Sequence, residues 1–74
     1  MRRYYFDVDD GRHHVHDEVG RKLTDRDVAV IEAGIILRSL SQIRVFQGRP
    51  GTTSVRVRDA NGRQVYESSI QFEG

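Results

Sequence analysis

The sequence predicts an α+β fold, β-β-α-β-β, in which two hairpins form a four-stranded antiparallel sheet and one long helix packs on one face. Asp10-Gly11 and Asn61-Gly62 are typical hairpin turns, because glycine readily takes the positive φ of a type I′ turn. Residues 25–46, between the hairpins, carry helix signals at both ends. A chain of 74 residues has room for a single domain, residues 1–74.

The first hairpin is predicted from alternation of residue types. Tyr4, Phe6 and Val8 share one face of a strand over residues 3–9, and polar residues alternate with them. A second strand is expected over residues 12–16, directly after the first Xaa-Gly turn. The two strands should therefore present one apolar face to the helix.

The helix is predicted from its caps. Thr24 and Asp25 are both good N-cap residues, and the helix is expected over residues 25–46. Gly48 and Pro50 follow as typical stop signals.

The second hairpin repeats the alternating pattern. Val55 and Val57 should point inward from a strand around residues 54–58, and the last strand should cover residues 64–72. Its expected inward side chains are Tyr66, Ile70 and Phe72. Residues 17–20 predict an irregular crossing, after which Leu23 tucks under the helix.

The helix is more apolar than a single contact with a sheet requires. At 100° per residue, one sector, which we assign to the sheet, contains Val28, Ile31, Ile35, Ile43 and Phe46. A second stripe contains Val30, Ala33, Leu37 and Leu40. A domain of this size has difficulty covering a helix all round, so the second stripe predicts a protein interface, most simply a homodimer. In the alternative, strands and loops of the same chain cover that stripe.

Composition excludes several classes of site. There is no cysteine, which removes disulfides, thiolate nucleophiles and cysteine zinc sites. No apolar run reaches the roughly 20 residues needed to cross a bilayer, and we expect a cytoplasmic protein without membrane contact. The serines occur in no nucleophile-elbow context, and residues 48–53 lack the lysine of a phosphate-binding loop. We expect no catalytic residue and no cofactor.

Two polar clusters contain residue types that occur in metal sites. His13, His14 and His16 lie close together beside Asp17, and imidazoles with a carboxylate suit zinc, nickel or copper. An exposed hairpin edge explains the same pattern more simply, so no metal site is predicted. The acidic group around Asp7, Asp9 and Asp10 lacks the remaining ligands of a calcium loop, and turn chemistry explains it better.

Nucleic-acid binding is the alternative function. Arg56 and Arg58 should project from the open face of the sheet with Tyr5, and arginines with aromatics can bind phosphates and stack bases. The net charge of +1 does not favour this interpretation. The expected residues of the open face are Tyr5, Asp7, Asp9, Arg56, Arg58, Glu67, Ser69 and Gln71.

The order of several short motifs resembles a known family. These motifs are residues 3–8 with Asp10-Gly11, Asp17-x-x-Gly20-x-x-Leu23, Ala29-x-x-Glu32-Ala33 and Val57-x-Asp59-x-x-Gly62-x-x-Val65. Together they are similar to a family of short alpha-proteobacterial proteins, domain of unknown function 6894. The resemblance implies a small stand-alone protein and supplies no activity, cofactor or catalytic residue. From the residues we therefore expect a homodimeric protein-interaction module whose other partner, if it has one, is unknown.

Overall fold

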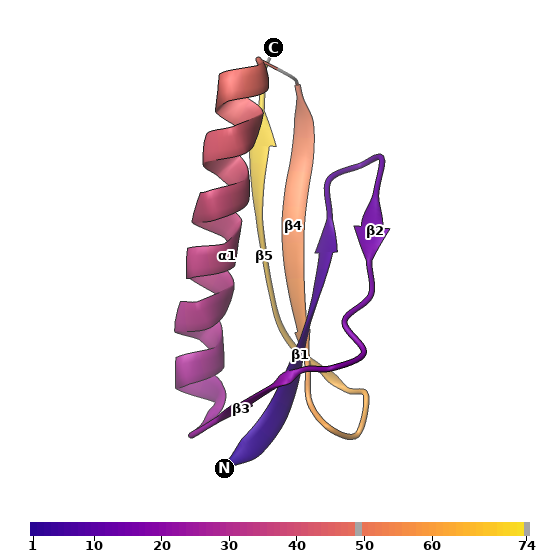
Figure 1. Ribbon diagram of the computed structural model, residues 1–74, viewed down its shortest axis with the longest axis vertical. Helices are drawn as coiled ribbons and strands as arrows, with labels where there is room; N and C mark the ends of the chain where they lie inside the picture. Colours follow the sequence, from indigo (N-terminus) through magenta and orange to yellow (C-terminus); the bar gives the residue numbers. More distant parts are fainter. Residues whose placement is uncertain (49, 74) are drawn as a thin grey trace.

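The computed structural model confirms the predicted α+β class and describes residues 1–48 and 50–73, with the backbone alone for residues 44–47. Its elements, in chain order, are β1 (Arg2–Asp9), β2 (His14–Val15), β3 (Arg21–Leu23), α1 (Arg26–Gln47), β4 (Gly51–Arg58) and β5 (Gln64–Phe72). The helix runs along one side of the sheet, and β2 lies on the far side of β1 from β4 (Figure 1).

The sheet has one more strand than the sequence predicted. Its order is β2-β1-β4-β5, and β3 also pairs with β1, so it has five strands. All pairings are antiparallel. The short β3 aligns with the beginning of β1, from Arg2 opposite Leu23 to Tyr4 opposite Arg21. Leu23 packs against the core, as expected.

Both hairpin loops are longer than two residues, because aspartate side chains organise them. In the first loop, the Asp10 carboxylate accepts hydrogen bonds from the backbone N–H groups of Arg12 and His13. The predicted strand over residues 12–16 is therefore shortened to His14–Val15. In the second loop, the Asp59 carboxylate accepts from Asn61 N and Arg63 N. Gly11 and Gly62 keep the positive φ that the turn signals predicted.

Asp25 is the N-cap of α1. Its carboxylate accepts a hydrogen bond from Val28 N at 3.1 Å, and Ala29 N donates to its carbonyl oxygen. The helix therefore begins at Arg26, one residue later than predicted. No helix in the described part of the chain combines the length and hydropathy needed to cross a lipid bilayer.

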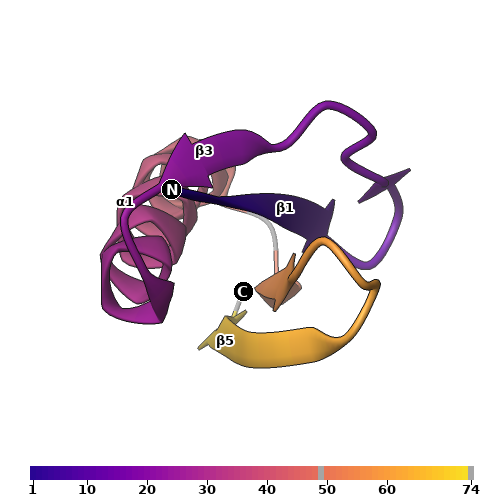
Figure 2. The same cartoon turned by 90° about the horizontal axis from the view of Figure 1, so that it is seen from below.

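The helix packs on the sheet with the opposite face from the one predicted. Ala29, Ala33 and Leu37 are buried together with Tyr4, Phe6, Val55 and Val57. Ile31, Ile35 and Ile43 are instead exposed, and the side chain of Phe46 lies outside the described residues. The reason is size: aromatic rings and valines already fill the sheet face, so alanines let the helix approach closely. Figure 2, seen along the strands, shows α1 against one side of the sheet.

The polar face of the sheet has the composition expected from the alternation. Tyr5 lies opposite Arg58, and Asp7 lies opposite Arg56, which in turn lies opposite Glu67. Asp9, Ser54 and Ser69 form the next row. This register places β1, β4 and β5 side by side and brings the predicted open-face residues together.

Candidate functional site

The densest polar contacts on the open face surround Arg58. Its guanidinium donates to both carboxylate oxygens of Asp7, at 2.6 Å from Nε and 3.1 Å from Nη2. Nη2 also donates to the backbone carbonyl of Asp17 at 2.8 Å. The guanidinium carbon lies 5.0 Å from the centre of the Tyr5 ring, within cation–π range. Two of the predicted nucleic-acid contacts, Tyr5 and Arg58, are therefore engaged within the chain.

Asp17 connects this group to the crossing before the helix. Its carboxylate accepts hydrogen bonds from the backbone N–H groups of Phe6, Val19 and Gly20, at 3.0–3.1 Å. Its own N–H donates to Asp7 Oδ1 at 2.9 Å. We call Tyr5, Asp7, Asp17 and Arg58 the Asp17 cluster. The cluster fixes residues 17–20 against β1 and β4.

Electrostatics in the cluster favour the charged forms. The hydrogen bonds from Arg58 hold the pKa of Asp7 below its usual value, outweighing the opposite effect of burial. The same contact raises the pKa of Arg58. Burial alone would raise the pKa of Asp17, but hydrogen bonds from Gly20, Phe6 and Val19 lower it overall. The carboxylates of Asp7 and Asp17 are therefore both held in the ionised form, and this arrangement suits a structural role.

Gly20 completes the crossing for two reasons. Its φ is +73°, in the region that favours glycine. A Cβ there would also lie 2.9 Å from the backbone oxygen of Tyr4 and from side-chain atoms of Arg3 and Tyr5. The Asp17-x-x-Gly20 motif of the sequence is therefore explained by close packing of the crossing on β1.

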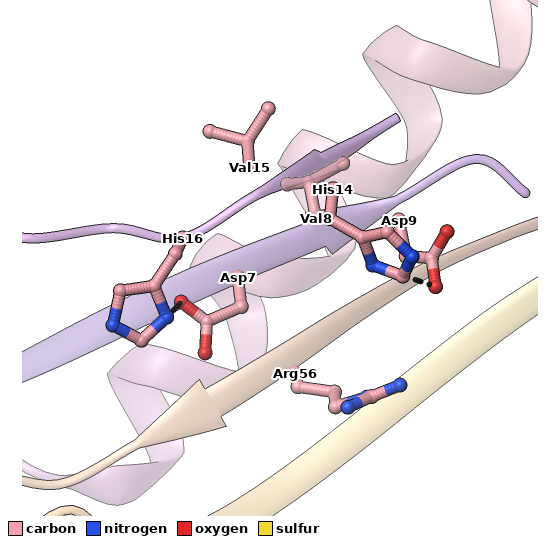
Figure 3. A pocket seen from close by; sticks show the side chains of 7 residues that line it. All are labelled: Asp7, Val8, Asp9, His14, Val15, His16 and Arg56. Atoms are coloured by element: carbon pink, nitrogen blue, oxygen red, sulfur yellow. Dashed lines mark ion pairs between the residues drawn. The ribbon is translucent and has the colours of Figure 1, made fainter. Parts of the chain in front are cut away.

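His14 and His16 line a hollow of about 130 Å³ on the same face, bordered by Arg56 (Figure 3). His14 Nδ1 lies 3.2 Å from an Asp9 oxygen, and His16 Nδ1 lies 3.5 Å from an Asp7 oxygen. Figure 3 shows each ring beside one carboxylate, as the β1–β2 register dictates. His13 is separate and lies 3.7 Å from Asp10.

This hollow is poorly arranged for a cation. Within residues 1–48 and 50–73, no group of three or more His, Asp or Glu side chains is placed to hold a metal ion. The nearby Arg56 guanidinium adds positive charge to the hollow. His16 Nε2 is 3.4 Å from Arg58, so that nitrogen also faces a cationic side chain.

Arg56 has a weaker setting than Arg58. Its Nε lies 2.9 Å from Glu67, and both side chains are about half exposed, at 49% and 47%. An exposed pair of this kind contributes little to stability. The pair does place the Glu67 carboxylate beside Arg56, the third residue that the sequence suggested as a nucleic-acid contact.

The stripe predicted as a protein interface lies mainly against the sheet. Ala33 is 0% exposed and Leu37 is 5% exposed, so their assignment to a free surface is wrong. Val30 and Leu40 are half-buried at the margins of the helix–sheet contact. Ile31, Ile35 and Ile43 form an exposed apolar surface, here called the outer face of α1.

A second hollow of about 470 Å³ was not anticipated from the sequence. Its lining residues are Met1, Arg2, Arg3, Tyr4, Arg26, Asp59, Ala60, Asn61 and Val65. Arg26 is engaged there through a hydrogen bond from Nε to the Val65 carbonyl at 3.1 Å. This bond attaches the start of α1 to β5.

Together these features define a small α+β domain of one helix on an antiparallel sheet, whose polar cluster is structural. Comparison with protein families matches residues 3–71 to the domain of unknown function DUF6894, and the chain belongs to that family. No curated protein and no solved structure matches it. The motifs that carry the resemblance include Asp17, Gly20 and Asp59, whose contacts shape the crossing and the second hairpin loop.

Proposed function

We propose that this protein is a small non-catalytic module that acts by binding protein, in the first place a second copy of itself. The observation that carries the proposal is the outer face of α1. Ile31, Ile35 and Ile43 are 63%, 52% and 57% exposed. Large apolar side chains gathered on one surface are typical of contact sites.

The distribution of side-chain sizes along α1 supports this proposal. The buried face of the helix includes two alanines, whereas three isoleucines face solvent. A domain of 74 residues has a marginal core, and exposing three isoleucines gives up burial that would stabilise a monomer. Association with another chain recovers apolar burial without a larger core.

The ionisable groups support a role without catalysis. A general acid or base works best with a pKa close to the operating pH. The pKa values of Asp7 and Asp17 are lowered, and their oxygens are occupied by hydrogen bonds from Arg58 and from backbone N–H groups. These carboxylates are therefore better suited to holding the crossing in place.

Nucleic-acid binding through Tyr5, Arg56 and Arg58 is the competing proposal, and the geometry favours it less. Arg58 is bound to Asp7 and stacked on Tyr5, and Arg56 is paired with Glu67. Phosphate binding would have to displace two carboxylates. If the protein does bind nucleic acid this way, affinity should fall steeply with salt and weaken in Arg56→Ala.

Light scattering coupled to size-exclusion chromatography, with the 260/280 nm absorbance ratio recorded, tests the proposal. We expect a mass twice the 8.5 kDa of one chain and a protein-like ratio. A single-chain mass that persists at high protein concentration would overturn self-association. A raised ratio that disappears at high salt would favour the nucleic-acid proposal.

A further inference from the structure

The outer edge of β5 is the one long sheet edge that the described residues leave unpaired. At the other end of the sheet, the outer edge of β1 is paired with β2 and β3. β5 has nine residues and pairs only with β4. Figure 2 shows it at the opposite end of the sheet from β3. Every second residue of such an edge directs its backbone N–H and C=O groups away from the sheet.

At the start of β5 this edge is protected, because the register against β4 shifts at Val65 and the Val65 carbonyl accepts a hydrogen bond from Arg26. Over residues 66–72, which pair regularly with β4, the edge lacks the usual protection against pairing with another chain. Edge strands are commonly protected by proline, lysine or inward-pointing charge. The β5 sequence QVYESSIQF has no proline or lysine, and its single charge, Glu67, is paired with Arg56 of the same sheet. The edge is therefore long, nearly neutral and suited to self-pairing.

We infer that two copies of this chain associate by antiparallel pairing of their β5 strands around a two-fold axis, forming one continuous sheet. This inference rests on the self-association in the proposed function, but it places the contact between the two copies at the β5 edges and beside α1 rather than on the outer face of α1. Antiparallel pairing of identical strands is self-complementary, as a two-fold interface requires.

The position of α1 fits this arrangement. The helix lies over β4 and β5. Neighbouring strands lie about 4.8 Å apart, so in the joined sheet a helix above β4 and β5 would lie roughly 10 Å from α1 of the second copy. That separation is close to the usual 8–10 Å between packed helices. Strand pairing would therefore bring the two helices into side-by-side contact on one face of the sheet.

The flank of α1 that would meet its mate carries Gly34. Arg26 contacts Val65 of β5, whereas Glu32 pairs with Arg21 of β3, so the two sides of the helix can be distinguished. At about 100° per residue, Gly34 lies about 200° around the helix from Glu32, and therefore on the flank that faces away from β3. Apart from its chain neighbours and the backbone of α1 itself, no described atom lies within 4 Å of the position that its Cβ would take, so a single chain supplies no packing reason for a glycine. A mid-helix glycine costs roughly 1 kcal/mol relative to alanine, and close approach of a second helix would explain it.

The register follows from the faces of the strand. Tyr66, Ser68 and Ile70 lie opposite the inward residues of β4, and Glu67 and Ser69 lie on the other face. In an antiparallel pair of strands, two residues directly opposite each other point to the same face of the sheet. When the two strands are identical, the two-fold axis must therefore pass between one residue and its own copy. An axis at Glu67 would oppose two carboxylates. An axis at Ser68 avoids this, pairs residues 66–70 of the two copies and sets Tyr66 opposite Ile70 of the second copy.

Disulfide trapping tests the register, because the chain has no cysteine and any disulfide in a single-cysteine variant joins two copies. Ser68→Cys should form a covalent dimer in dilute solution under a glutathione buffer, since directly opposed residues have Cα atoms about 4.5–5.5 Å apart. Ser69→Cys, on the same strand, is the matched control. Its sulfur should face Glu67 of the second copy, so we expect cross-linking at least about tenfold slower, because a Cα separation above about 7 Å prevents a disulfide. Equal rates for the two variants, or no cross-link in either, would overturn the inference.

A second pair of variants tests the helix contact. Gly34→Leu should shift the mass from two chains to one while circular dichroism stays unchanged, because the new side chain points into open space in a single chain. Ser39→Leu, which also puts leucine in place of a small residue at an exposed helix position, should leave the mass of two chains. A Gly34→Leu protein that keeps the mass of two chains would contradict helix contact beside β5.

The proposed function and this inference fail in different ways. A wild-type protein with the mass of one chain would refute self-association itself. A wild-type dimer that resists Ser68→Cys trapping but dissociates on Ile31→Glu with Ile35→Glu would leave self-association standing. That result would move the interface to the outer face of α1 and overturn the pairing of β5 edges.

Discussion

Replacing Leu37 by alanine should destabilise the fold much more than replacing Ile31, although both residues lie on the same helix. Leu37 is 5% exposed and packs in the core, and a Leu→Ala change at such a site costs about 2–5 kcal/mol. Ile31 is 63% exposed, so about a third of its surface is buried. Since full burial of isoleucine contributes roughly 1.5–3 kcal/mol, Ile31→Ala should cost at most about 1 kcal/mol. The better helix propensity of alanine offsets part of that cost.

Urea unfolding followed by far-UV circular dichroism measures this difference. With an m-value of about 1 kcal/mol/M for a small domain, Leu37→Ala should lower the midpoint by about 2 M or more and Ile31→Ala by less than about 1 M. All variants must be compared at one protein concentration, because self-association makes stability depend on concentration. Equal losses, or a well-folded Leu37→Glu monomer, would show that the buried and outer faces have been assigned wrongly.

Three further predictions concern the Asp17 cluster and the histidine hollow. The pKa values of Asp7 and Asp17 are lowered in the fold, so their stabilising effect is present above the unfolded pKa of about 4 and is lost as pH falls through the folded values. Thermal melts from pH 7 down to pH 2 should show this loss of stability. The melting temperature of Asp7→Asn should fall less over this range than that of the wild type. Gly20→Ala should cost more than Gly62→Ala, because both have positive φ but only Gly20 has neighbouring atoms at 2.9 Å; equal melting temperatures would contradict the packing argument. Stoichiometric zinc should leave the melting temperature unchanged, and a rise that His14→Ala abolishes would show that the hollow binds metal after all.

Much of the fold could be predicted because local signals and long-range packing agree. The alternation of Tyr4, Phe6 and Val8, and of Val55 and Val57, correctly gave the inward face of β1 and β4. The cap at Asp25 placed the start of α1 within one residue. Each of these features depends on residues close together in sequence.

The helix orientation could not be predicted from hydropathy, because it depends on the space that the sheet leaves. Ala29 and Ala33 are less apolar than Ile31 and Ile35, yet they pack against the sheet where large side chains would not fit. The strand Arg21–Leu23 was missed for a similar reason, since its pairing is imposed by β1. A size-weighted helical projection would have pointed to the alanine face.

The Asp17 cluster was predicted only in fragments. The sequence indicated Asp17 and Gly20 as turn residues, and Arg58 as one of the charged side chains on the open face of the sheet. Their roles depend on the contact between Asp7 and Arg58, which are 51 residues apart. No local pattern reveals that an arginine will meet an aspartate at that distance along the chain.

The place of β1 in the sheet has a consequence for the order of folding. β1 is synthesised before α1, but its partner β4 comes only after α1. During translation β1 can pair only with β2 and β3, and its other edge stays open until residue 58 has left the ribosome. The contiguous unit α1-β4-β5 can assemble locally, so we expect insertion of β1 beside β4 to be the slow, late step. The Asp7–Arg58 contact would then form as the two halves of the chain join.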